Sequence, residues 1–165
     1  MARCFLAVRP PAAARAAIVE LQRELDDQVR LVPPEQLHVT LRFWDDVEPA
    51  DVVAALAGAQ LPAATARVGP GLEPLGAGAI VLPVSGLDRL AAAVAHATRR
   101  LGPEEQRPFV GHLTVARRRG GRTPPTVPIA LAFGVREVEL VTSRLGPGGA
   151  SHHRVARWPV PEPAD

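Results

Sequence analysis

One pattern, histidine, aliphatic, threonine, aliphatic, occurs twice in this chain of 165 residues. Residues 37–43 read LHVTLRF and residues 111–117 read GHLTVAR, so the two histidines are His38 and His112. Each copy lies in a run rich in β-branched and apolar residues, which predicts a strand. Because side chains alternate across a strand, each histidine shares one face with the threonine two positions later.

If the two strands lie side by side about a pseudo-twofold axis, Thr40 and Thr114 meet the two histidines in one groove. Threonine hydroxyls donate to phosphate oxygens, and paired imidazoles can take and give a proton. On the opposite face, the aliphatic residues and Phe43 are expected in the core. A single His-x-Thr is a weak motif, and the alternative is that both histidines only pack against a sheet.

The remaining pattern predicts more strands than helices. Helices are expected at 11–27, 50–60 and 88–101, and strands at 3–8, 37–43, 78–84, 109–116, 135–145 and 151–158. Several strands follow each other closely, which favours an α+β arrangement with antiparallel pairs over a doubly wound parallel sheet. The length suits one compact domain or two small lobes sharing a core.

Charge is distributed unevenly along the chain. Residues 1–98 hold 8 arginines and 11 acidic residues, whereas residues 99–158 hold 11 arginines and 4 acidic residues. The basic second half suits a polyanion such as RNA, and a solvated arginine-rich surface is the equally weighted alternative. All 19 basic residues are arginine, so the absence of lysine excludes a nucleotidyl-lysine ligase. The single cysteine, Cys4, permits no intrachain disulfide.

The chain shows neither a signal-peptide pattern nor an apolar run long enough to span a membrane, so we expect a cytoplasmic protein without a membrane partner.

With these motifs in view, the chain resembles the 2H phosphoesterase superfamily. Within it, the chain is most similar to one branch, the bacterial and archaeal RNA 2′,3′-cyclic phosphodiesterases, also called 2′-5′ RNA ligases (ThpR or LigT type). The matching segments are residues 3–8, 32–43, 112–117, 143–150 and 156–159. The resemblance implies one bilobal α+β domain over residues 1–165, with two small, mainly antiparallel sheets and outer helices around a central cleft. It also implies a pseudo-twofold axis and a monomer.

The resemblance further implies hydrolysis of 2′,3′-cyclic phosphate ends to 2′-phosphomonoesters, with reversible, ATP-independent 2′-5′ RNA ligation. The implied roles are general acid for His38, general base for His112 and phosphate binding for Thr40 and Thr114, with neither metal nor cofactor. The expected partner is RNA with a cyclic phosphate end, such as a tRNA fragment, or a small cyclic nucleotide. The alternatives are a 2H enzyme for small cyclic nucleotides or ADP-ribose cyclic phosphate, and a non-catalytic nucleotide-binding module.

Two arginines are candidate substrate contacts. Strand parity puts Arg42 on the face of His38, at the cleft edge, or else on the protein surface. The same parity turns Arg117 away from His112, so a phosphate contact there requires a bulge or a strand end. The loop at residues 117–122 can hold an RNA backbone or be simply solvated.

The chain departs from the family pattern at three places. Gly111 replaces a usual proline, Asp45 replaces a common glycine, and His152-His153 occupy a place where an aromatic residue is usual. Adjacent strand residues face opposite ways, so the last pair is a poor metal chelator.

Overall fold

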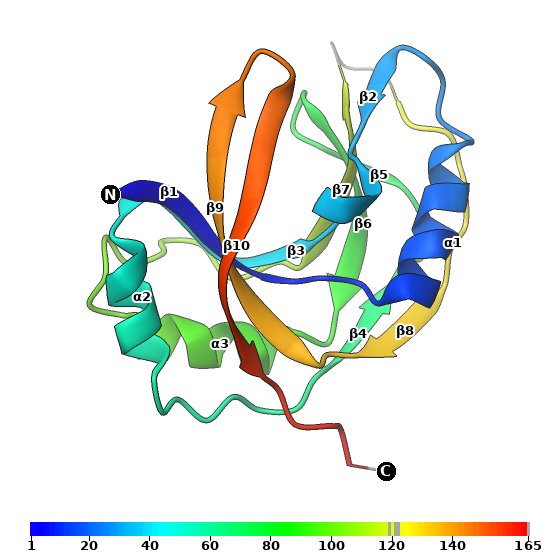
Figure 1. The fold of residues 1–165 in the computed structure, drawn as a ribbon. Helices are drawn as coiled ribbons and strands as arrows, with labels where there is room; N and C mark the ends of the chain where they lie inside the picture. Colours follow the sequence, from blue (N-terminus) through cyan, green and yellow to red (C-terminus); the bar gives the residue numbers. More distant parts are fainter. Residues whose placement is uncertain (119, 121–122, 165) are drawn as a thin grey trace.

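The computed structural model describes residues 1–118, 120 and 123–164, and Figure 1 shows its mixed α+β architecture. The helices are α1 (Ala12–Gln22), α2 (Pro49–Leu56) and α3 (Asp88–Ala97), with a 3-10 turn, η1 (Pro34–Gln36). The strands are β1 (Ala2–Val8), β2 (Val29–Leu31), β3 (Val39–Val47), β4 (Thr65–Val68), β5 (Glu73–Leu75), β6 (Ala79–Ser85), β7 (His112–Arg118), β8 (Leu131–Gly134), β9 (Glu137–Gly146) and β10 (Gly149–Pro159).

The strands form one curled sheet in the order β10-β9-β1-β3-β7-β6-β4-β8, with β2 added to β7 and β5 to β6. Every strand pair within the described part of the chain is antiparallel, so the predicted α+β class with antiparallel sheets is confirmed. The two halves of the sheet are joined where β3 meets β7, through the single residue pair Val39 and Leu113. The two sheets that were predicted are therefore parts of one continuous sheet, and they join where the two motifs meet.

Helices α1 and α3 each pack on the half of the sheet that does not contain the strand preceding them in sequence. Helix α1 follows β1 but packs on β7 and β8, whereas α3 follows β6 but packs on β3 (Figure 1). The apolar sides of these helices enter the core, with Ile18 of α1 and Leu90 and Val94 of α3 fully buried. This exchange binds the two halves together and leaves the opposite face of β3 and β7 open.

The sequence prediction missed four short strands and extended all three helices too far at their C-terminal ends. Strands β2, β4, β5 and β8 have only three or four residues each, too few for a clear alternation, and β5 contains a proline. Helix α1 ends at Gln22, α2 at Leu56 and α3 at Ala97. None of the helices in the described ranges is long and apolar enough to cross a membrane.

Candidate active site

The two His-x-Thr segments lie next to each other in the sheet. Val39 and Leu113 are antiparallel partners and both are fully buried. In an antiparallel pair, residue numbers rise along one strand as they fall along the other. His38 therefore lies beside Thr114, and Thr40 lies beside His112. All four side chains are half-buried on the open face of the sheet. The two motifs are therefore neighbours on one face, as strand geometry predicts.

His38 is held by contacts on every side of its ring. Its Nδ1–H donates to the carbonyl oxygen of Gln36 at 2.6 Å, and its Nε2 lies 3.0 Å from the hydroxyl of Thr40. Because a carbonyl only accepts, the neutral ring has its lone pair on Nε2 and accepts the Thr40 hydroxyl proton. Phe5 stacks on the ring at 4.6 Å and His152 meets it edge-on at 5.7 Å.

His112 repeats the same arrangement. Its Nδ1–H donates to the carbonyl oxygen of Val110 at 3.1 Å, two residues earlier, as Gln36 is to His38. The neutral ring therefore also carries its lone pair on Nε2. In both motifs the backbone therefore holds Nδ1 and leaves Nε2 as the ring atom that can accept a proton.

Burial lowers the pKa of His38 to about 4. The hydrogen bond to Gln36 partly opposes this shift, while the positive charges of His152, Arg9 and Arg117 add to it. The pKa of His152 is also lowered, chiefly by burial and then by Arg9. His38 is therefore neutral at pH 7, chiefly because it is buried, and the neighbouring charges of Arg9 and Arg117 favour a bound anion.

A β-bulge follows the threonine of each motif. On β3, Ala7 pairs with Thr40 but Leu6 pairs with Arg42, so one residue is skipped. On β7, Val81 pairs with Thr114 but Ile80 pairs with Ala116, again one residue further. A bulge reverses the alternation of the side chains beyond it, so the residues after each motif change faces.

The bulge on β3 overturns two parity predictions. Arg42 turns into the protein, where it is 6% exposed and donates to the carbonyl oxygens of Thr98 at 2.7 Å and Leu101 at 2.6 Å. Its guanidinium also lies over the Trp44 ring at 4.7 Å. Arg42 also lines the cavity that reaches Thr40 and His112, but its guanidinium is held by the backbone at the end of α3 and does not stand free at the cleft edge. Phe43, expected in the core, is 37% exposed on the face of Thr40.

A phosphate contact by Arg117 requires a bulge or a strand end after His112, and β7 has such a bulge. Arg117 pairs with Ala79, Thr114 with Val81 and His112 with Pro83, and these three partners alternate on β6, so all three β7 side chains share one face. Arg117 is exposed, and its charge lowers the pKa of His38. Arg119, Gly121 and Arg122 of the predicted RNA-holding loop lie outside the described residues.

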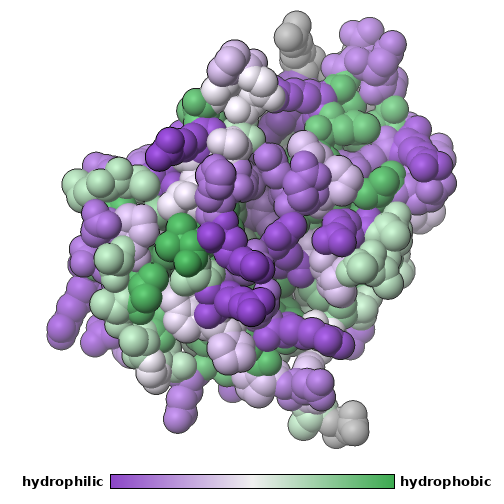
Figure 2. All heavy atoms as spheres, viewed as in Figure 1, coloured by the Kyte–Doolittle hydropathy of each residue, from purple (hydrophilic) through white to green (hydrophobic). Residues whose placement is uncertain are grey.

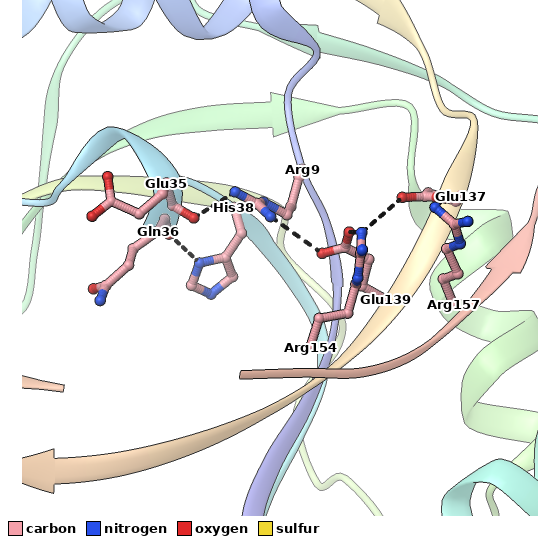
Figure 3. Close-up of polar contacts among 8 residues, drawn as sticks. All are labelled: Arg9, Glu35, Gln36, His38, Glu137, Glu139, Arg154 and Arg157. Atoms are coloured by element: carbon pink, nitrogen blue, oxygen red, sulfur yellow. Dashed lines mark hydrogen bonds and ion pairs between the residues drawn. The ribbon is translucent and has the colours of Figure 1, made fainter. Parts of the chain in front are cut away.

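A chain of ion pairs supports the segment that orients His38 (Figure 3). The Glu139 side chain is only 4% exposed and lies 3.1 Å from Arg154 and 3.7 Å from Arg9. Arg9 in turn donates to the carbonyl oxygen of Glu35 at 2.6 Å, next to Gln36. Sequence reasoning missed Arg9, Glu139 and His152. The available signal was a carboxylate, Glu139, between the apolar residues Val138 and Leu140 of β9.

Two cavities open on either side of the motifs. The smaller, about 380 Å³, is lined by His38, Phe5, Arg9, Glu139, His152 and Arg154, among others. The larger, about 940 Å³, reaches Thr40 and His112 and continues along α3. Figure 2 shows hydrophilic side chains gathered over the middle of the molecule, in the region where β10 lies in front of β1 and β3 in the view of Figure 1. Within the described ranges, no three His, Cys, Asp or Glu side chains form a metal-holding group.

Gly111, the departure from the usual proline, is explained by close packing against β6. A Cβ atom at this position would stand 2.2 Å from the carbonyl oxygen of Val84. We expect Gly111→Ala to destabilise the fold by about 1–3 kcal/mol because backbone atoms would have to move. Thermal unfolding measures this, with Gly78→Ala as the control, since a Cβ at Gly78 meets nothing within 4 Å. Equal melting temperatures for both variants would contradict the packing argument.

The comparisons with known proteins agree with this architecture. Residues 8–69 match the family model described as LigT like phosphoesterase. TT0787 of Thermus thermophilus is similar at 29% identity and a TM-score of 0.82, covering 95% of this chain and 97% of that one. Escherichia coli LigT complexed with 3′-AMP has 24% identity and a TM-score of 0.80, covering 96% and 98%. The MHV ns2 PDE domain shares the fold at 18% identity and a TM-score of 0.62, covering 93% and 99%. No curated protein sequence matches significantly.

Proposed function

We propose that this chain is an RNA 2′,3′-cyclic phosphodiesterase, because residues 8–69 match the LigT like phosphoesterase family model and the fold is similar to that of TT0787 and LigT. It opens the cyclic phosphate at an RNA end and leaves a 2′-phosphomonoester. The observation that carries this proposal is the junction of the two His-x-Thr segments at Val39 and Leu113. That junction supports a site in which two imidazoles and two hydroxyls surround one phosphate.

Opening the ring requires a base for water and an acid for the departing ribose oxygen. The lowered pKa of His38 favours this ring as the base, because it is neutral at pH 7. We therefore assign His38 as the base and His112 as the acid, the reverse of the roles implied by the family resemblance. Thr40 and Thr114 donate to the non-bridging oxygens, where charge accumulates in the transition state.

The proposed steps balance in protons. Water gives a proton to Nε2 of His38 as its oxygen bonds to phosphorus. The bond from phosphorus to the ribose O3′ breaks, and O3′ takes the proton from Nε2 of His112. With a 5′-hydroxyl in place of water, the same steps join two RNA ends through a 2′-5′ linkage without ATP.

The test is incubation of the purified protein, with a chelator present, with an RNA that ends in a 2′,3′-cyclic phosphate. We expect turnover to a 2′-phosphate end, identified by comparison with synthetic 2′- and 3′-phosphate standards. A 3′-phosphate product would contradict the leaving-group assignment, and loss of turnover with chelator would contradict a reaction that needs only these side chains. No turnover under any condition would favour the non-catalytic binding module.

The pH dependence follows from the neutral state of His38. Its pKa of about 4 means that kcat/KM for the cyclic phosphate stays high at pH 6 and falls on the acid side with a midpoint near pH 4. His152→Ala should move this midpoint upward, since it opens the ring to water and removes a positive neighbour. An acid-side midpoint near the ordinary histidine value of about 6.5 in the unsubstituted protein would argue against His38 as the base.

A further inference from the structure

The larger cavity is continuous with the reaction centre but extends well beyond it. Thr40 and His112 line one end, and the cavity then follows α3 toward the segment before β7. Its volume of about 940 Å³ is at the upper end of the range, roughly 300–1,000 Å³, that holds drug-sized ligands. A cyclic phosphate and one nucleoside leave much of this space unfilled.

The walls of the cavity suit stacked bases. Phe43, brought to this face by the bulge on β3, and Phe109 both line it. The exposed alanines Ala92 and Ala95 of α3 line it as well and keep it open, because they carry no long side chain. Flat aromatic rings in an open groove bind successive bases without reading their identity.

The charges in the cavity suit a short length of nucleic acid. Four arginines line it: Arg99, Arg100 and Arg107, together with Arg42, whose guanidinium already donates to backbone carbonyl oxygens. Three carboxylates also line it: Asp88, Glu104 and Glu105. This balance predicts binding dominated by stacking, with a weak dependence on salt, because few phosphates would be neutralised.

The sizes of the two cavities indicate which part of the substrate each can hold. An RNA that ends in a cyclic phosphate continues from its last nucleoside only in the 5′ direction, so its further nucleotides need the roomier cavity. That cavity is the one of about 940 Å³ that begins at Thr40 and His112 and follows α3, because the other has only about 380 Å³. The smaller cavity, lined by His38, is left for water or for an incoming 5′-hydroxyl end.

We propose that the groove along α3 binds the nucleotides immediately 5′ of the cyclic phosphate, with bases stacked on Phe43 and Phe109. This inference rests on the proposed function and adds to it that the enzyme prefers an RNA oligonucleotide over a cyclic mononucleotide. Stacking of one further base should raise kcat/KM about tenfold or more.

The experiment compares kcat/KM for 2′,3′-cyclic AMP with that for a trinucleotide ending in the same cyclic phosphate. We expect the trinucleotide to be preferred at least about tenfold, and Phe109→Ala to remove most of that preference. Ala92→Trp, at an exposed position on α3, should do the same by filling the groove without disturbing the core. Val53→Ala, at an exposed position on α2 outside both cavities, is the matched control.

The outcomes separate this inference from the proposed function. Equal use of the mononucleotide and the trinucleotide by the unsubstituted protein would overturn the groove and leave the phosphodiesterase intact. A preference that survives both Phe109→Ala and Ala92→Trp would also overturn it. Failure to turn over either substrate would instead overturn the proposed function itself.

Discussion

Replacing His112 with alanine is expected to lower kcat for a 2′,3′-cyclic phosphate by about 10²- to 10⁴-fold, the usual contribution of a positioned acid or base. The ribose O3′ is a poor leaving group, and His112 is the proposed source of its proton. The same variant should lose far less on a p-nitrophenyl phosphodiester, because p-nitrophenolate departs without protonation. Initial rates with the two substrates measure the difference.

His38→Ala is the matched comparison. A base for water is needed whatever group departs, so this variant should lose about 10²- to 10⁴-fold on both substrates. The opposite pattern, rescue of His38→Ala and not of His112→Ala by the aryl substrate, would reverse the assigned roles. Equal losses for both variants on both substrates would contradict any division into an acid and a base.

Thr40→Val and Thr114→Val are each expected to lower kcat by about 10²- to 10³-fold, as loss of one donor to a charged transition state usually does. Valine keeps the size and branching of threonine and removes only the hydroxyl. Thr40→Val should also shift the pH profile, because the Thr40 hydroxyl bonds to Nε2 of His38 in the free protein.

Thr40→Ser and Thr114→Ser supply the control, since serine keeps the hydroxyl and should retain most of the rate. Melting temperatures of all four variants show whether the fold is preserved. Valine variants that turn over as fast as the unsubstituted protein would remove the hydroxyls from the proposed mechanism.

The site core was predictable because it depends on a short-range rule. Alternation along a strand places His38 with Thr40 and His112 with Thr114, and the repeated pattern pointed to an encounter of the two segments. The structure has that encounter at Val39 and Leu113. Helices α1 and α3 and the longer strands were also predictable, since each has a clear apolar period.

The residues just beyond the motifs were not predictable from alternation. The bulges after Thr40 and Thr114 arise from pairing with β1 and β6, which are distant in the sequence. Because of the bulge on β3, Arg42 points into the protein and Phe43 points to the face of Thr40, the reverse of what alternation predicts. The bulge on β7 puts Arg117 on the face of His112. No local propensity signals either bulge, because Leu41 and Val115 are ordinary strand residues.

The second layer of the site was also beyond sequence reasoning. Glu139, Arg9 and His152 come from β9, the segment after β1, and β10, and only tertiary pairing brings them to His38. The low pKa of His38 has the same origin, because burial by packed neighbours is its main cause. Burial of this kind depends on the whole fold, and it is the basis on which we propose proton-transfer roles opposite to those implied by resemblance.

The most direct measurement is a crystal structure of the protein with a bound 2′-nucleotide, the product of the proposed reaction. We expect one phosphate with Nε2 of His38 and Nε2 of His112 each about 3 Å from a different phosphate oxygen, and with both threonine hydroxyls donating to it. A phosphate held by Arg9 and Arg154 alone, with either imidazole out of hydrogen-bonding reach, would contradict the two-histidine site.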